Sequence, residues 1–225
     1  NENEDGLFVC DLGQGWFVLA VVDGMGGLPD GELAARLTLE AFERALADRS
    51  HPTDPACIEE AVVEGFERAN RAVLDDARGA GATLVAAIVG PRSVQVVHAG
   101  DAEALLVGQR GRVKLRTIAH SPTGFALADG SMPELAALVH PERHLVTNAI
   151  GMPPVTVEVG PVLRLAARDT LVLASDGLFD NLTQNEIADG VRCGPLLVAA
   201  ARTVNVVRGR MLDSLRFEAQ SPAPI

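Results

Sequence analysis

The pattern of apolar and polar residues predicts two strands and then two helices in the first third of the chain. Residues 7–10 and 16–22 have the apolar content of strands, and the "DLGQG" stretch between them is typical of a hairpin turn. Asp54 followed by Pro55 indicates the start of a later helix. Apolar residues at helical spacing predict two amphipathic helices, one through Ala35, Leu39, Phe42 and Leu46 and one through Ile58, Val62, Phe66, Ala69 and Val73. We expect these helices to pack side by side, antiparallel, on a sheet.

From residue 82 the period of the apolar positions changes to two, which predicts strands. Short segments rich in Val, Leu and Ala alternate with turn sequences and indicate antiparallel strands at 82–89, 93–98, 103–108 and 112–117. Further along, we expect a strand through Val155, Val157 and Val159, a strand at 169–175, helices near 183–191 and 195–208, and a last strand after Asp213. Strands and helices fall in separate blocks, so the fold class is α+β.

Residues 118–152 break this regularity. They combine Pro, Gly and scattered His without a clear period, and we expect a functional insertion between strands. No internal repeat or Pro/Ser-rich linker divides the sequence, so we expect a single domain over residues 1–225.

Composition and charge exclude several classes of protein. The 30 acidic residues outnumber the 19 Lys and Arg, giving a net charge of −11 without a basic patch, which argues against nucleic acid and anionic membranes as partners. The apolar run at 16–22 is too short to span a bilayer, and the acidic "NENEDG" start is unlike a signal peptide. Three scattered cysteines without a C-x-x-C pair argue against a disulfide scaffold or structural zinc. We therefore expect a cytoplasmic protein.

Four aspartates are the candidate chemical groups. Asp23 in "VVDGMGG", Asp101 in "HAGDAE" and Asp176 in "LASDGLFD" each follow an expected strand, and Asp5 lies in "NENEDG". A single Asp-Gly is most often only a turn. Several carboxylates brought together at strand ends would repel one another unless a cation neutralised them, and an all-oxygen ligand set favours Mg²⁺ or Mn²⁺. No P-loop, complete G-x-G-x-x-G or G-x-S-x-G motif is present as an alternative.

The order of motifs "NED", "VVDGMGGLPDGELAA", "GATLVAAIV", "VVHAGDAEALLV", "AIG" and "SDGLFDNLTQNEI" resembles the metal-dependent protein phosphatases of the 2C type, especially bacterial ones. "DGMGG" together with "SDGL" is the specific part. The resemblance implies a β-sandwich of two antiparallel sheets flanked by helix pairs, with a binuclear metal site at one end. It also implies that residues 118–152 form the flap beside that site, where His120 and His144 are candidates for substrate contact.

The resemblance also implies roles for single residues and for two or three Mn²⁺ or Mg²⁺ ions. Asp23 would bridge two metals, the Gly24 carbonyl and Asp176 would bind one each, Asp5 would act mainly through water, and Asp101 would help to hold a third. Asp23 and Asp176 would thereby be the catalytic pair, in an enzyme whose metal-bridging water attacks the phosphorus of phosphoserine or phosphothreonine. Asp213 is the candidate for the last metal ligand, because it follows Asp176 at about the family's separation. The partners would be phosphoprotein substrates, and the family is commonly monomeric.

The sequence departs from the family pattern at several positions, and these leave two alternatives open. The usual "GDSR" reads "GDAE" with Glu103, Ala119 replaces an aspartate, and Met25 stands where many eukaryotic relatives have a histidine. The family's phosphate-binding arginine would precede Asn1 of the sequence given. One alternative is therefore a 2C-like regulatory or binding domain with weakened catalysis. The other is an unrelated metal-dependent hydrolase that uses the same carboxylates.

Overall fold

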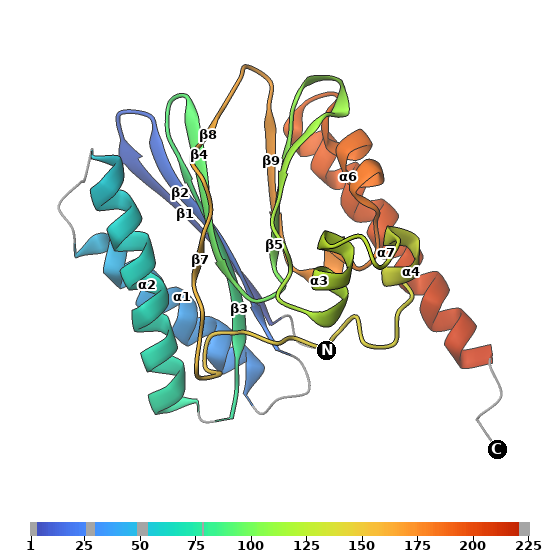
Figure 1. Ribbon diagram of the computed structural model, residues 1–225, viewed down its shortest axis with the longest axis horizontal. Helices are drawn as coiled ribbons and strands as arrows, with labels where there is room; N and C mark the ends of the chain where they lie inside the picture. The colour runs from blue at the N-terminus through green and yellow to red at the C-terminus, as the bar shows by residue number, and fades with distance from the viewer. Residues whose placement is uncertain (1–3, 26–29, 49–53, 78, 221–225) are drawn as a thin grey trace.

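The protein is a sandwich of two antiparallel sheets with a helix pair over each outer face (Figure 1). The computed structural model describes residues 4–25, 30–48, 54–77 and 79–220, the last seven of these as backbone only. The first sheet has the order β1-β2-β3-β4-β7, with β8 also paired to β4, and the second has the order β6-β5-β9. The expected α+β sandwich is confirmed.

The bounds of most strands agree with the apolar pattern, but the strand expected through Val155, Val157 and Val159 is reduced to residues 158–159, and a second two-residue strand at 163–164 was not expected. The first sheet consists of β1 (Asp5–Gly13), β2 (Trp16–Gly24), β3 (Ala82–Val89), β4 (Ser93–Ala99) and the two-residue strands β7 (Glu158–Val159) and β8 (Leu163–Arg164). The second consists of β5 (Glu103–Val107), β6 (Val113–Arg116) and β9 (Thr170–Ala174). Buried aliphatic residues of β3 and β4 pack against those of β5 and form the core between the sheets.

The first helix pair covers the outer face of the larger sheet. α1 (Gly31–Ala47) and α2 (Pro55–Asp76) bury their apolar stripes there, and the rings of Phe42 and Phe66 meet edge to face with centroids 5.8 Å apart. Asp54 caps α2 as predicted, because its side chain accepts a hydrogen bond from the Ala56 amide.

The second helix pair corrects one prediction. α6 (Gln184–Val191) and α7 (Leu196–Gln220) pack on the smaller sheet, and α7 extends well past the expected end at residue 208. The strand predicted after Asp213 is therefore wrong, because that residue lies within α7. Residues 210–220 contain no Pro or Gly and many good helix formers, so the helix continues. In the described part of the chain, no helix combines the length and the apolar character needed to cross a membrane.

Residues 118–152 contain only two short helices, α3 (Pro122–Ala128) and α4 (Glu134–Ala137), and otherwise turns. Both lie at one end of the sandwich, beside the smaller sheet (Figure 1). The end of the segment is tied down, since the Thr147 amide and hydroxyl both donate to the His120 carbonyl, and Ile150 bridges to Ala82 of β3. The segment is irregular, as predicted, and it is held against the sandwich.

Candidate metal centre

The first two candidate aspartates face each other across a strand pair. In the antiparallel register of β1 and β2, Asp5 lies directly opposite Asp23. Asp23 shares its face of β2 with Val21, which packs in the core between the sheets, so its carboxylate lies at the end of that core. Like charges placed opposite each other destabilise a strand pair unless something neutralises them.

The other two aspartates come from the smaller sheet. Glu103 of β5 pairs with Ala174 of β9, and continuing this register outward brings Asp101 across from Asp176. Asp101 follows Gly100, whose positive φ of 116° makes the turn after β4. A Cβ at Gly100 would lie 2.4 Å from the Thr83 Cβ, so only glycine fits there. Asp176 begins the short helix α5 (Asp176–Phe179) directly after β9.

These carboxylates raise one another's pKa. Burial raises the pKa of Asp23 to about 8, with further increases from Asp176, Asp5 and Asp101. Burial and Asp176 raise the pKa of Asp101 to about 7, and Asp101 is only 7% exposed. Burial is also the largest influence on Asp176 and raises its pKa. The negative charges of these aspartates therefore repel one another when all are ionised, and binding a cation or protons reduces that repulsion.

Gly24 lies against the start of α1, where no side chain would fit. Its amide donates to the Glu4 carbonyl over 3.2 Å, and a Cβ at this position would lie 2.3 Å from the Gly31 carbonyl oxygen. The backbone of the "DG" pair can therefore lie at the edge of the carboxylate group without a side chain between them.

Asp180 is a further member that the sequence predictions missed. It caps α5, four residues after Asp176, and the spacing in "DGLFD" is the signal that could have revealed it, because positions i and i+4 share a helix face. Burial, then Asp176 and Asp101, raise the pKa of Asp180 to about 7. Among the described residues no hydrogen bond reaches its buried Oδ2 atom.

Residues 143 and 144 of the 118–152 segment approach this acidic group. His144 Nδ1 lies 3.5 Å and Arg143 Nε lies 3.8 Å from Asp180 Oδ2. Ligand atoms of His144, Asp176 and Asp180 all lie within 4.8 Å of one another. His144 is 60% exposed at its side chain, so it also faces solvent.

The donor set fits a hard divalent cation. It offers carboxylate oxygens from several elements, one of them buried without a hydrogen bond, and their raised pKa values show that negative charge is poorly compensated in the metal-free chain. Oxygen ligands of this kind suit Mg²⁺ and Mn²⁺ better than softer metals.

His120 and Asp213 lie elsewhere. His120 is buried, stacks on His98 with ring centroids 4.6 Å apart, accepts from the Gly100 amide at Nδ1, and has Nε2 3.3 Å from Glu158. His98 is a packed, hydrogen-bonded residue as expected, with Nε2 3.1 Å from the Ile118 carbonyl. Asp213 lies on α7 and is exposed. Substrate contact by His120 and metal binding by Asp213 both stay predictions.

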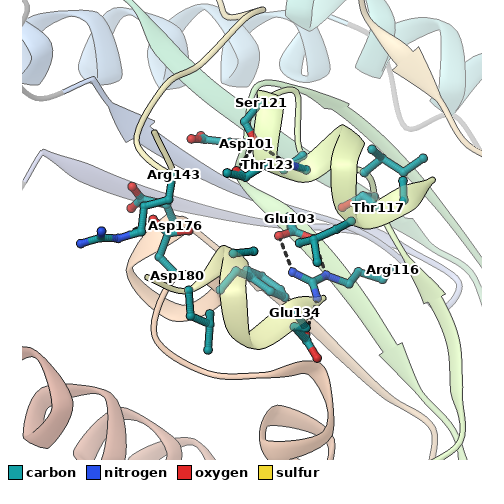
Figure 2. Close-up of a pocket in the computed structure, with 18 of the residues that line it drawn as sticks. Asp101, Glu103, Arg116, Thr117, Ser121, Thr123, Glu134, Arg143, Asp176 and Asp180 are labelled. Carbon is teal, nitrogen blue, oxygen red and sulfur yellow. Dashed lines mark hydrogen bonds and ion pairs between the residues drawn. The ribbon is translucent and has the colours of Figure 1, made fainter. Parts of the chain in front are cut away.

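A cavity of about 370 Å³ adjoins the acidic group, and Glu103 lies in its wall (Figure 2). Arg116 donates from Nε and Nη2 to the two oxygens of Glu103, over 2.7 and 3.0 Å, and from Nη1 to Glu134 over 2.7 Å. The Gln184 amide also donates to Glu134, over 2.6 Å. Glu103, which stands where the family's "GDSR" motif has arginine, is thus paired with the guanidinium of Arg116 from the neighbouring strand β6.

Comparisons with known proteins agree with this geometry. Residues 1–215 match the model of a family described as protein phosphatase 2C. A relative in Streptococcus pyogenes, whose name assigns it to the 2C type of protein phosphatase, is 30% identical over 193 residues, covering 83% of this chain and 77% of the relative.

Solved structures give the same result. The serine/threonine phosphatase of S. agalactiae superposes with a TM-score of 0.80 at 26% identity, over 93% of this chain and 88% of that one. The catalytic domain of the serine/threonine protein phosphatase PstP, solved with two manganese ions, superposes with a TM-score of 0.71 at 25% identity, over 93% and 86%. The chain belongs to the protein phosphatase 2C family.

Proposed function

We propose that this protein is a metal-dependent phosphoprotein phosphatase that hydrolyses phosphoserine and phosphothreonine. The observation that carries the proposal is the group of mutually repelling carboxylates at one end of the sandwich, beside a cavity. Asp5, Asp23, Asp101, Asp176 and the Gly24 carbonyl would hold two or three Mn²⁺ or Mg²⁺ ions, whereas Asp213, the sequence-based candidate for a further ligand, is exposed on α7. The manganese ions in the related PstP structure support the same metal class.

The chemistry divides between the ions and the chain. When bound, divalent cations supply Lewis acidity and activate water for attack on phosphorus. The carboxylates of Asp23 and Asp176 fix where that chemistry happens, because they extend from a rigid strand end and a helix start. His144 lies at the acidic group but is exposed, a position suited to contact with substrate.

The Glu103–Arg116 pair bears on the alternative of a domain with weakened catalysis. A change from arginine to glutamate at position 103 would by itself bury an acid beside the site. Arg116 neutralises that acid with two hydrogen bonds, so the cavity wall keeps a guanidinium. The glutamate at position 103 therefore supports a rearranged cavity wall, with its guanidinium supplied by Arg116, and it does not support loss of the metal site.

We expect phosphoproteins as substrates, a monomeric, cytoplasmic protein, and one domain in which residues 118–152 are the flap.

The deciding experiment measures phosphate release from p-nitrophenyl phosphate and from a phosphothreonine peptide, with Mn²⁺ and with EDTA. We expect release only with the metal, and none from Asp23→Asn. Asp75→Asn, an exposed change on α2, is the matched control and should keep wild-type activity. Full activity in EDTA would overturn the proposal. Two bound Mn²⁺ ions without turnover of any phosphopeptide would favour a binding domain, and turnover of phosphodiesters alone would favour an unrelated hydrolase.

A further inference from the structure

His120 lies where three segments of the chain meet. Its ring hydrogen-bonds to Gly100 in the turn after β4, to Asn148 near the end of the 118–152 segment, and to Glu158 of β7. It is only 6% exposed and stacks on the ring of His98. A buried ring with bonds at both nitrogens has a fixed orientation, so it can in turn fix the position of its neighbours.

Two of the bonds made by His120 enclose Gly100. The His120 amide donates to the Gly100 carbonyl over 3.0 Å, and the Gly100 amide donates to His120 Nδ1 over 3.1 Å. Gly100 has a φ of 116° and packs so closely on Thr83 that no Cβ would fit. Both backbone polar groups of Gly100 are therefore bonded to His120, and the turn between β4 and β5 has little freedom.

The hydrogen bonds also determine the tautomer of His120. Asn148 exchanges two hydrogen bonds of 2.8 Å with the backbone of Thr156, and this orients its Nδ2 atom toward His120 Nδ1, also over 2.8 Å. An amide NH₂ and a backbone N–H only donate, so His120 Nδ1 accepts and carries no proton. The proton of the neutral ring is then on Nε2, 3.3 Å from Glu158 Oε2.

This tautomer separates His120 from the metal ligands. Ligand atoms of His98, His120 and Glu158 lie within 4.8 Å of one another, as they would around a cation. However, Nδ1 of His120 is occupied by donors and Nε2 carries the proton, so neither nitrogen offers a lone pair to a metal. An effect of His120 on the metal centre must therefore pass through the residues to which it is bonded.

The turn held by His120 leads directly into Asp101. Burial raises the pKa of Asp101 to about 7, and a hydrogen bond from its own backbone amide partly opposes that increase. A carboxylate bonded to its own amide follows the backbone, so a change in the turn at Gly100 also moves the carboxylate. Asp101 and Ser121, the residue after His120, both line the cavity (Figure 2).

We propose that His120 is a positioning residue for the cation site at Asp101. By accepting a hydrogen bond from the Gly100 amide, its Nδ1 atom holds the turn in the conformation that directs the Asp101 carboxylate at the ions. Residues that orient a metal ligand commonly change metal affinity when they are replaced. The inference rests on the proposed function, in which Asp101 is a ligand of a divalent cation, and it gives His120 a role through Asp101 in place of direct contact with substrate.

Two substitutions separate the two sides of the ring. In His120→Asn, the amide oxygen takes the place of Nδ1 and accepts from Gly100, whereas His120→Gln puts its amide near the position of Nε2 and leaves Gly100 without an acceptor. Calorimetry measures Mn²⁺ binding to the metal-free protein, and Asp101→Asn identifies the binding step that belongs to this site. We expect His120→Gln to weaken that step about tenfold and His120→Asn to stay within about threefold of the wild type.

Glu158→Ala is the matched control, because it removes the bond at Nε2 and leaves both bonds to Gly100. We expect all three variants to lower the unfolding temperature and only His120→Gln to lower Mn²⁺ affinity. A purely structural role for His120 predicts instead that Mn²⁺ affinity follows the unfolding temperature in all three. That result, unchanged affinity in His120→Gln, or an equal loss in His120→Asn would overturn the proposal.

The wild type offers a test that does not depend on any variant folding. We expect the nitrogen chemical shifts of the His120 ring to show a proton on Nε2 and none on Nδ1, and the Gly100 amide to exchange slowly with solvent. A proton on Nδ1 would overturn the proposal, since the Gly100 amide would then have no acceptor in His120.

Mn²⁺ binding is measured without turnover, which keeps this proposal distinct from the proposed function. A chain whose Mn²⁺ binding depends on His120 as expected, but which releases no phosphate from phosphopeptides, would overturn the function alone. Phosphate release that requires Mn²⁺, combined with Mn²⁺ binding that is indifferent to His120→Gln, would overturn the role of His120 alone. A wild type that binds no Mn²⁺ would overturn both.

Discussion

Two groups of acids, each with one buried member and half-buried neighbours, line the same cavity, and their negative charge is compensated in different ways. Glu103 and Glu134 share one guanidinium from Arg116, with hydrogen bonds of 2.7 to 3.0 Å. Asp101, Asp176 and Asp180 have no such cation at hydrogen-bond distance among the described residues. Burial raises the pKa of all three and of Glu103 too, but only at Glu103 does a directly bonded guanidinium counteract it. The first group is complete within the chain, whereas the second needs protons or ions from outside.

The difference separates residues that maintain the fold from residues that serve chemistry. A buried ion pair costs desolvation and recovers it only when every partner is in place, so breaking it destabilises the protein. A group of carboxylates without a closely bonded cation costs stability, and a fold retains that cost where binding an ion recovers it. The variants below should therefore affect activity and stability in opposite ways in the two groups.

The largest expected effect is on activity, from Asp176→Asn. We expect Mn²⁺-dependent phosphate release to fall by about 10³-fold or more, because an amide cannot replace the carboxylate as a ligand for a catalytic cation. The unfolding temperature of the metal-free variant should be equal to or above that of the wild type, since one repelling charge is gone. Calorimetric unfolding in EDTA measures this unfolding temperature for the variant and the wild type. A variant with more than a tenth of wild-type activity would contradict the assignment.

The second group should show the opposite pattern in Arg116→Met. Removing the guanidinium leaves Glu103 buried without its cation, and we expect a loss of about 3 kcal/mol of unfolding free energy. The double variant Glu103→Gln with Arg116→Met should recover part of that loss, because the fully buried charge of Glu103 is then gone and Glu134, which is partly exposed, keeps the Gln184 amide. Urea unfolding of both variants and of Glu103→Gln gives the coupling energy. Equal stability of the single Arg116→Met and the double variant would show that the pair is not coupled.

The pH dependence of stability gives a smaller effect, which reports on the repulsion among the aspartates without mutation. The pKa of Asp23 is raised from 3.8 to about 8 and that of Asp101 from 3.8 to about 7. At pH values between the usual aspartate pKa of 3.8 and these raised values, the folded, metal-free chain holds more protons than the unfolded chain. Its stability therefore falls as pH rises. The slope should approach about 1.4 kcal/mol per pH unit for each proton involved.

Urea unfolding in EDTA at pH 5.5 and pH 8.0 measures this loss. Saturating Mn²⁺ should abolish or reverse it, because metal binding requires the ionised carboxylates. A metal-free protein that is more stable at pH 8.0 than at pH 5.5 would contradict the repulsion inferred for this group.

The sequence predicts the sheets, the first helix pair and four of the aspartates, because each depends on local patterns. Periods of two and 3.6 mark β3 and α2, and the Asp-Gly turns mark Asp23 and Asp176. Contacts between distant segments are not predictable in this way. Arg116 reaches Glu103 only through the register of β5 and β6, and Arg143 reaches Asp180 only through the path of the 118–152 segment.

The C-terminal region was mispredicted for a different reason. After residue 208 the pattern is compatible with either a helix or a turn followed by a strand, and the resemblance to a family with a C-terminal strand favoured the strand. Local helix propensity, with no Pro or Gly from 210 to 220, favours the continued helix that the structure has.

The smallest expected effect follows from this difference, in Asp213→Ala. A ligand to a divalent cation would lose at least tenfold in Mn²⁺ affinity when truncated, whereas an exposed helical residue changes it little. Since Asp213 is exposed on α7, we expect Mn²⁺ binding and phosphate release to stay within about twofold of the wild type. Calorimetric titration with Mn²⁺, with Asp176→Asn as the positive control, measures the change. A tenfold loss would instead place Asp213 with the aspartates that need an external cation and would extend that group onto α7.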